Sequence, residues 1–216
     1  MSVAAFFDMD RTLIRVNSGA LWISFLRERR EISFAKMLRA MLWLGQYKLS
    51  ILDLEAVAQK LVRGMAGDEE AELEQKSRGF FEERIARHIS DEGRRALARH
   101  RALGHTLVLL TSSTRYVAGP LAAALDIEHV LCTRLGVEAG RFDGTLELPA
   151  CYGAGKVHHA ERFCAQRGLD LERSYFYTDS FSDLPMLERV AGARVVNPDG
   201  RLARFAEKVG WEVLSW

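Results

Sequence analysis

The sequence predicts an α/β fold: a Rossmann-like, mainly parallel sheet with helices on both faces, interrupted by an inserted all-helical segment. Short apolar runs with the length of buried strands alternate with amphipathic stretches of helical length. This alternation stops between about residues 17 and 88, where the chain has no strand-like run and no proline. Three apolar runs end in Asp, Thr or Ser, as expected at the edge of a parallel sheet where ligands bind.

The composition limits the size of the protein and its partners. A chain of 216 residues can form one sizeable core with a smaller inserted domain. Lys and Arg total 30 against 29 Asp and Glu, so no broad basic surface predicts nucleic-acid binding. The three cysteines form no CxxC pair, which indicates reduced thiols and a cytoplasmic location.

The first strand is predicted over residues 2–7, SVAAFF, a short buried run bounded by polar residues. Four helices are expected after it, and Asp68 is a plausible N-cap of the last one. Their predicted ranges are Ser18–Glu31, Ser33–Gln46, Ile51–Gly64 and Asp68–His88.

The most apolar part of this helical segment, residues 34–52, is interrupted by Lys36, Arg39 and Lys48, so it is not predicted to span a membrane. We expect its central part, MLRAMLWLGQYKL (residues 37–49), to pack on neighbouring helices, and no membrane contact is expected. Its apolar excess beside three cations also fits a site for an apolar substrate or an anionic membrane surface.

Strands and helices alternate again in the second half of the chain. The dipeptide Asp143-Gly144 predicts a turn or bulge within a short β segment. Strands or short β segments are expected over 105–113, 129–133, 135–138, 141–148, 174–179 and 193–197, and helices over 91–104, 116–126, 155–168, 183–190 and 200–209.

Two aspartates follow the first predicted strand directly. Asp8 and Asp10 are two residues apart on an extended chain, so their side chains leave on the same side and repel if both are ionised. A divalent cation removes that repulsion, and Mg²⁺ prefers hard oxygen ligands. Asp179, at the end of another predicted strand, can supply a further carboxylate. The sequence therefore predicts a magnesium site at this edge of the sheet.

These residue types also predict phosphoryl chemistry. The Asp8 carboxylate is a candidate nucleophile that forms an aspartyl-phosphate, and Asp10 can act as the general acid and base. The charge on the transferred group needs nearby donors and cations. We expect the Thr111 hydroxyl, the Ser112 backbone N–H and the Lys156 ammonium to supply them.

The motifs FFDMDRT, LLTSS, GAGK and YTDSFSD, in this order, resemble the four signature motifs of the haloacid dehalogenase-like (HAD) superfamily, in its phosphoserine-phosphatase-like branch, subfamily IB. The resemblance covers essentially the whole chain. It implies that Mg²⁺ is held by the side chains of Asp8 and Asp179 and by the backbone carbonyl of Asp10. It further implies that Asp183 acts mainly outside the set of metal ligands, where it orients waters or Lys156.

The resemblance also implies a division of the chain into two domains. Residues 1–16 and 89–216 would form the Rossmann-like catalytic core, and residues 17–88 a helical cap that closes over the site and selects the substrate. Asn17 stands where phosphoserine phosphatases carry a glutamate toward the substrate's amino group, and Ser182 stands where an asparagine is usual. Phosphoserine and histidinol phosphate are both candidate substrates.

The predicted function is a Mg²⁺-dependent phosphatase for a small phosphorylated metabolite. A phosphotransferase is the close alternative. A non-enzymatic, phospho-accepting signalling module is another, although Asp10 argues against it because a receiver gains little from an acid and base. A carbon–halogen hydrolase would have no need for the acidic cluster. A nucleotide P-loop is excluded because Val157 follows the lysine of GAGK.

Overall fold

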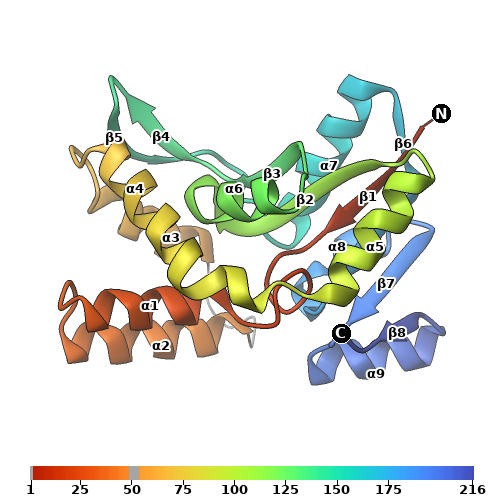
Figure 1. Ribbon diagram of the computed structural model, residues 1–216, viewed down its shortest axis with the longest axis horizontal. Coiled ribbons are helices and arrows are strands. Elements are labelled where there is room, and N and C mark those ends of the chain that lie inside the picture. The colour runs from red at the N-terminus through yellow and green to blue at the C-terminus, as the bar shows by residue number, and fades with distance from the viewer. Residues whose placement is uncertain (1, 49–53) are drawn as a thin grey trace.

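The computed structural model describes residues 2–48 and 54–216, and within them the chain forms a six-stranded, all-parallel sheet (Figure 1). The strand order is β3-β2-β1-β6-β7-β8. Both the parallel pairing and the alternation with helices were expected from the sequence, so the α/β prediction is confirmed. The strands are β1 (Ser2–Phe7), β2 (Thr106–Thr114), β3 (His129–Thr133), β6 (Leu169–Thr178), β7 (Gly192–Val196) and β8 (Glu212–Leu214).

Helices cover both faces of the sheet because successive strand residues point to opposite sides. Phe7 on β1 is buried together with residues of α5 (Asp91–Ala102) and α6 (Arg115–Ala124). Its neighbour Phe6 is buried with residues of the helices on the other face. These are α7 (Ala154–Arg167), α8 (Leu184–Leu187) and α9 (Gly200–Val209).

The expected helical segment is present between β1 and α5. It consists of α1 (Ser18–Glu28), α2 (Phe34–Lys48), α3 (Leu54–Arg63) and α4 (Glu70–Phe80), then a π-helical turn (Phe81–Ile85) and a 3-10 turn (Ala86–His88). The predicted start of the third helix at Ile51 lies outside the described residues.

Asp68 is not the N-cap of α4, and this expectation was wrong. The cap residue is Glu69, whose side chain makes no capping hydrogen bond. The backbone of Asp68 is instead held by its neighbours, because its N–H donates to the Met65 carbonyl (3.0 Å) and its carbonyl accepts from the Phe142 N–H (3.0 Å).

A small antiparallel hairpin joins the helical segment to the sheet-containing part. It is formed by β4 (Leu135–Glu138) and β5 (Arg141–Leu146), and β5 packs on α3. Gly67 N–H donates to the Phe142 carbonyl (2.8 Å). The hairpin pairing is irregular and Gly144 has φ +81°, in agreement with the turn or bulge predicted there.

Helix α2 is more exposed than the sequence predicted. It packs along α1, and its apolar residues Phe34, Leu38, Met41 and Leu42 are exposed to solvent. Within residues 37–48 the helix packs on α1 as expected, but the side chains of Leu38, Met41 and Leu42 do not take part in that packing. None of the helices in the described residues has the length and apolar character needed to cross a bilayer.

Two elements, β6 and the helix after it, differ in length from their predictions. Strand β6 starts at Leu169 rather than at Ser174, and the helix expected over 183–190 is a 3-10 turn (Phe181–Asp183) followed by the four-residue α8. The 3-10 turn forms where the Ser180 hydroxyl accepts the Ser182 N–H (3.4 Å) and competes with regular helix geometry.

Candidate functional site

Two of the predicted site residues follow the central strands of the sheet. Asp8 comes directly after β1, and its N–H donates to the Tyr177 carbonyl of β6 (2.8 Å), which continues the strand pairing. Asp179 follows the end of the same strand β6. Strand pairing therefore brings together two aspartates that are 171 positions apart in the sequence.

The buried ammonium of Lys156 connects two carboxylates at this edge. Its Nζ lies 2.8 Å from Asp8 Oδ1 and 2.7 Å from Asp183 Oδ2, and only 3% of its side chain is exposed. The Thr178 hydroxyl also donates to Asp183 Oδ2 (2.6 Å). Burial by itself would lower the pKa of Lys156, but Asp183 and Asp8 outweigh it and raise the pKa. Lys156 is thus a charged, buried lysine and not a solvated helix residue.

The glycines of GAGK explain how the lysine reaches this position. Gly153 precedes α7 with φ +53°, a conformation that side chains disfavour. A Cβ atom on Gly155 would lie 1.9 Å from the Ala150 carbonyl oxygen. Only glycine allows the chain before α7 to pass this close to the first turn, from which Lys156 projects toward the sheet edge.

The second aspartate of the motif is held by the start of the helical segment. Asp10 Oδ1 accepts the Ser18 N–H (3.0 Å) and Asp10 Oδ2 accepts an amide hydrogen of Asn17 (3.1 Å). The Asn17 carbonyl oxygen accepts the Ala20 N–H (2.9 Å) and so caps α1. Burial raises the pKa of Asp10, although the contacts with Ser18 oppose it. Both polar atoms of the Asn17 amide are therefore engaged within the chain.

Asp199 also positions this site, although sequence reasoning missed it. Its side chain accepts the Phe181 N–H (2.8 Å), and its own N–H donates to the Asp179 carbonyl (2.8 Å). Asp199 is at the same time the N-cap of α9, accepting from Arg201 and Leu202 N–H. An aspartate before a predicted helix is an ordinary capping signal, so the sequence contained no sign of its second contact.

Asp8, Asp10, Asp179 and Asp183 form what we call the carboxylate cluster. Burial raises the pKa of Asp8 to about 7, with Asp183 and Asp10 adding to the rise and Lys156 opposing it. Burial, followed by Asp8, Asp183 and Asp10, raises the pKa of Asp179 to about 8. The cluster thus concentrates negative charge that one ammonium does not balance when all four carboxylates are ionised.

This charge and these donor atoms fit a hard divalent cation. Mg²⁺ prefers carboxylate and carbonyl oxygens, and it would neutralise the negative charge of Asp8, Asp183 and Asp10, which adds to burial in raising the pKa of Asp179. In the described part of the chain, no group of three or more His, Cys, Asp or Glu side chains is close enough together to hold a metal ion without other ligands. The ligand set implied by the resemblance contains only two side chains, those of Asp8 and Asp179, together with the Asp10 carbonyl, so substrate and water would complete it.

Thr111 and Ser112 lie at the end of β2, the strand next to β1. Thr111 is buried, and its hydroxyl oxygen accepts the Ser113 N–H (3.2 Å). Within the residues that the structure describes, no hydrogen bond joins Thr111 to Asp8 or Lys156. Phosphate binding by these two residues stays a prediction.

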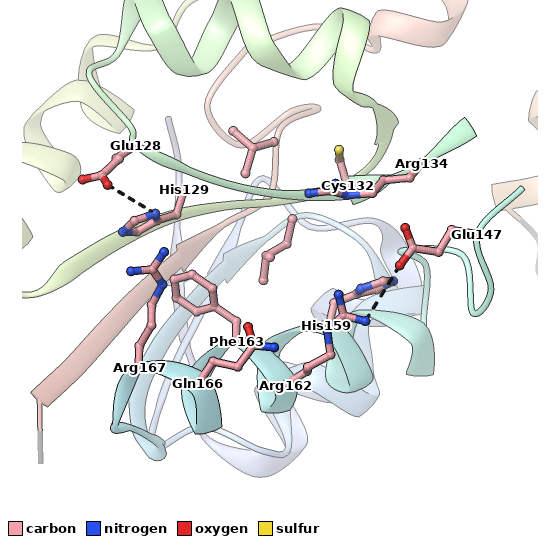
Figure 2. Close-up of a pocket in the computed structure, with 12 residues that line it drawn as sticks. Glu128, His129, Cys132, Arg134, Glu147, His159, Arg162, Phe163, Gln166 and Arg167 are labelled. Atoms are coloured by element: carbon pink, nitrogen blue, oxygen red, sulfur yellow. Dashed lines mark ion pairs between the residues drawn. The ribbon is translucent and has the colours of Figure 1, made fainter. Parts of the chain in front are cut away.

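A separate groove lies between β3 and α7 and has a volume of about 310 Å³ (Figure 2). Arg162 contacts Glu147 (3.8 Å) at one end, and Arg167 lies near His129 at the other. His159 lines this groove, and its Nε2 contacts the Pro149 carbonyl (2.8 Å). The groove contains no member of the carboxylate cluster, so it is not the candidate active site.

Comparison with known proteins gives consistent matches. A family profile of haloacid dehalogenase-like hydrolases matches residues 5–188. The chain is 31% identical over 219 residues to a phosphoserine phosphatase of Mycobacterium tuberculosis, with 99% of this chain and 70% of that protein covered. It is 28% identical over 221 residues to a histidinol-phosphatase of Neisseria meningitidis, with both chains fully covered. A solved structure of a Bordetella pertussis protein of unknown function has a TM-score of 0.88 at 29% identity, covering 99% of this chain and 98% of that chain.

Proposed function

The chain belongs to the haloacid dehalogenase-like hydrolase family, and we propose that it hydrolyses a small phosphomonoester with Mg²⁺ through an aspartyl-phosphate at Asp8. It is a phosphatase of the phosphoserine-phosphatase-like branch of that family. The observation that carries the proposal is the buried contact of Lys156 with both Asp8 and Asp183 (2.8 and 2.7 Å). A buried ammonium that two carboxylates hold in place is suited to stabilise the negative charge of a phosphoryl group.

In the first step, a carboxylate oxygen of Asp8 attacks phosphorus and the bond from phosphorus to the leaving oxygen breaks. Lys156 holds Asp8 Oδ1, so we assign the attack to Oδ2. Lys156 also offsets the negative charge on the equatorial phosphoryl oxygens. The N–H of Ser112 and the hydroxyl of Thr111, at the end of β2, are proposed as further donors.

Asp10 is proposed to protonate the leaving alkoxide and afterwards to take a proton from the water that attacks the aspartyl-phosphate. The raised pKa of Asp10 suits this role because the carboxyl can hold a proton closer to neutral pH. Ser18 and Asn17 fix the orientation of its two oxygens, and the remaining lone pairs can carry the proton.

Asp8, Asp179 and the Asp10 carbonyl would hold Mg²⁺, which supplies Lewis-acid polarisation of the phosphoryl group when it is bound. Asp183 contacts Lys156 and accepts from Thr178, so its proposed role is to orient the lysine. Asp199 is a positioning residue, because it ties down the backbone on both sides of Ser180.

We further propose that residues 17–88 act as a cap on a core formed by residues 1–16 and 89–216. The cap would be linked to catalysis through Asn17 and Ser18, which contact Asp10. The relatives named above support phosphoserine and histidinol phosphate as candidate substrates. The Asn17 amide is already engaged with Asp10 and Ala20, which favours a substrate that needs no carboxylate at this position. The free, buried cysteines suit a reducing, cytoplasmic location.

The decisive experiment measures turnover of p-nitrophenyl phosphate with Mg²⁺ for the parent protein, Asp8→Asn and the exposed control Asp143→Asn. We expect turnover by the parent and the control, loss of turnover in Asp8→Asn, and loss of the parent's activity with a chelator. An acid-stable phosphoryl label without turnover would instead indicate a phospho-accepting module. Activity that survives the chelator would contradict the metal-dependent reaction.

A second experiment addresses the substrate and the acceptor. Phosphoserine, histidinol phosphate and lysophospholipids are compared at equal concentration by release of inorganic phosphate. Added alcohols test for phosphoryl transfer: a phosphotransferase would form the new ester faster than it releases phosphate. Equal slow hydrolysis of every compound would contradict a dedicated metabolite phosphatase.

A further inference from the structure

The segment that follows β7 contacts both turns that carry the proposed metal ligands. Asn197 and Asp199 lie two residues apart, directly after that strand. The Asn197 side chain donates through Nδ2 to the Arg11 carbonyl (3.2 Å), one residue beyond Asp10. The Asp199 N–H donates to the Asp179 carbonyl (2.8 Å). Residues 197–199 thus join the turn after β1 to the turn after β6.

The side-chain amide of Asn197 is held firmly from the β8 side. Its Nδ2 has two hydrogens, and besides Arg11 it donates to the backbone oxygen of Trp216 (3.2 Å). Its Oδ1 accepts the Trp216 N–H (3.0 Å). The backbone N–H of Asn197 donates to the Leu214 carbonyl (2.9 Å). Both donors and the acceptor of the amide are therefore engaged, and the amide is fixed in position where it meets Arg11.

The turn that Asn197 contacts has an unfavourable backbone conformation. Arg11 has φ +55°, in the left-handed region that residues other than glycine rarely adopt. Such a conformation persists where the surrounding contacts fix it. The Arg11 N–H donates to the Val16 carbonyl (3.2 Å), and the Arg11 carbonyl accepts from Asn197. These two hydrogen bonds hold the peptide groups on both sides of the strained Arg11 Cα.

The peptide group before Arg11 contains the Asp10 carbonyl, a proposed ligand of Mg²⁺. This peptide bond is trans, so the Asp10 carbonyl points opposite to the Arg11 N–H. The backbone angles of Arg11 determine how its two peptide groups are oriented relative to each other. Loss of the Asn197 contact would therefore allow Arg11 to relax toward negative φ, and the Asp10 carbonyl would turn with it.

We propose that Asn197 is a positioning residue that fixes the direction of the Asp10 carbonyl for Mg²⁺. Together with Asp199, which contacts the turn after β6, it would hold the two turns of the metal site at a fixed separation. This role rests on the proposed function, in which Asp10 and Asp179 supply metal ligands. Among the described residues, the Asn197 side chain bonds to Arg11 and Trp216 and to no member of the carboxylate cluster, so it is not a catalytic residue.

A purely structural role is the alternative. Asn197 would then only attach Trp216 and the end of β8 to β7, and its contact with Arg11 would have no effect on the metal site. Both roles predict a loss of stability when the amide is removed. They differ in the affinity for Mg²⁺ and in the protection of the Arg11 N–H.

The first test measures Mg²⁺ binding by isothermal titration calorimetry, without substrate, for the parent, Asn197→Gly and Ser174→Ala. Glycine removes the amide and tolerates the positive φ of residue 197 (+42°). We expect the Kd for Mg²⁺ to rise about tenfold in Asn197→Gly. Ser174→Ala is the matched control, since it loses buried hydrogen bonds with the Ala4 N–H and the Asp170 carbonyl. It should lose stability and keep the Kd of the parent.

Each outcome of this titration has one meaning. A Kd in Asn197→Gly equal to that of the parent would overturn the positioning role and leave the proposed function intact. An equal rise in Ser174→Ala would overturn it as well, because the effect would then follow from a general loss of stability. A parent that binds no Mg²⁺ would contradict the proposed function, and the role of Asn197 would fall with it. At saturating Mg²⁺, kcat of Asn197→Gly should recover toward the parent value, since Asn197 contacts no reacting group.

The second test is amide hydrogen exchange of the metal-free protein, which depends on neither Mg²⁺ nor activity. The Arg11 N–H should exchange at least about tenfold faster in Asn197→Gly than in the parent, because its bond to Val16 requires the fixed backbone of Arg11. Asn197→Ala lacks the amide too and is measured in parallel, so that the result does not depend on the folding of one variant. Circular dichroism verifies that each variant folds. Unchanged exchange of the Arg11 N–H in a folded variant would refute the assignment.

Discussion

The ammonium of Lys156 lies 2.7 Å from a carboxylate oxygen of Asp183, and both side chains are almost completely buried. Lys156 comes from the first turn of α7 and Asp183 from the turn after β6, so the contact joins two elements that follow different strands. The same ammonium contacts Asp8 after β1. Three separate segments thus meet at one charge.

Replacing Lys156 should damage stability and activity together. In Lys156→Met, Asp8 and Asp183 lose the cation that compensates their burial. We expect a loss of about 3 kcal/mol in the free energy of unfolding, measured with urea, and at least about a thousandfold loss in kcat. Lys208→Met, on the exposed surface of α9, is the control and should change neither. Unaltered stability together with activity within tenfold of the parent would contradict the assigned role.

Asp199 should affect the reaction through the loop that it holds. Asp199→Ala removes the acceptor for Phe181 N–H and the cap of α9, which we expect to cost about 1–2 kcal/mol of unfolding free energy. The concentration of Mg²⁺ needed for half-maximal phosphatase activity should rise, because the turn that follows Asp179 loses its side-chain contact at Phe181 N–H. Asp199→Asn keeps one acceptor oxygen, which can cap α9 or accept from Phe181 N–H but not both, so it should recover most of the stability while the Mg²⁺ requirement stays raised. A loss of stability with no change in the Mg²⁺ requirement would reduce Asp199 to a simple helix cap.

Gly155 should tolerate no side chain. Gly155→Ala places a Cβ 1.9 Å from the Ala150 carbonyl oxygen, so the backbone before α7 has to move and carry Lys156 with it. We expect about 1–3 kcal/mol of destabilisation and a reduced kcat. Gly119→Ala is the matched control: nothing lies within 4 Å of its Cβ position in α6, so it should gain up to about 1 kcal/mol. Thermal unfolding of both variants decides between these outcomes.

We expect the contribution of His100 to the free energy of unfolding to decrease as the pH drops below neutrality. This side chain is 4% exposed, its Nε2 lies 2.9 Å from the Tyr177 hydroxyl, and burial, followed by His105, lowers its pKa to about 4. The unfolded chain binds a proton near pH 6.5, so the stabilising contribution is complete above that pH and is lost on descent toward pH 4. We expect this contribution to be about 2–3 kcal/mol.

The measurement compares urea unfolding of the parent, His100→Gln and the exposed control His158→Gln between pH 7 and pH 4. The difference between the parent and His100→Gln isolates this histidine from Asp8 and Asp179, whose raised pKa values act in the opposite direction. A difference that stays constant across this pH range would contradict the prediction. The His158→Gln curve should run parallel to the parent curve.

Much of the architecture was predictable because strands and helices leave periodic patterns in a sequence. The run 2–7 became β1, and 129–133 became β3, since short apolar runs between polar residues favour buried strands. The predicted α9 over 200–209 agrees with the observed bounds. Parallel pairing then places the carboxyl ends of β1 and β6 side by side, which is why Asp8 and Asp179 could be expected at one edge.

The contacts made by side chains at that edge could not be predicted in the same way. Thr178 looks like any strand residue, yet it donates to Asp183. Asn17 was assigned a position toward the substrate, and its amide instead joins Asp10 to the first turn of α1. Hydrogen bonds of this kind depend on rotamers and on distances between elements, and neither leaves a periodic signal.

The order of the motifs and the length of the apolar runs were enough to determine a parallel α/β sheet with acidic residues at its carboxyl edge, because local pattern and strand pairing follow from backbone geometry. Only the tertiary structure decided that Lys156 is buried between Asp8 and Asp183, that Asp199 holds the loop beside Asp179, and that apolar side chains of α2 are exposed to solvent. The physical reason is that the type of a residue indicates only that its side chain requires an apolar or an oppositely charged contact. The packing of distant segments determines which residue makes that contact.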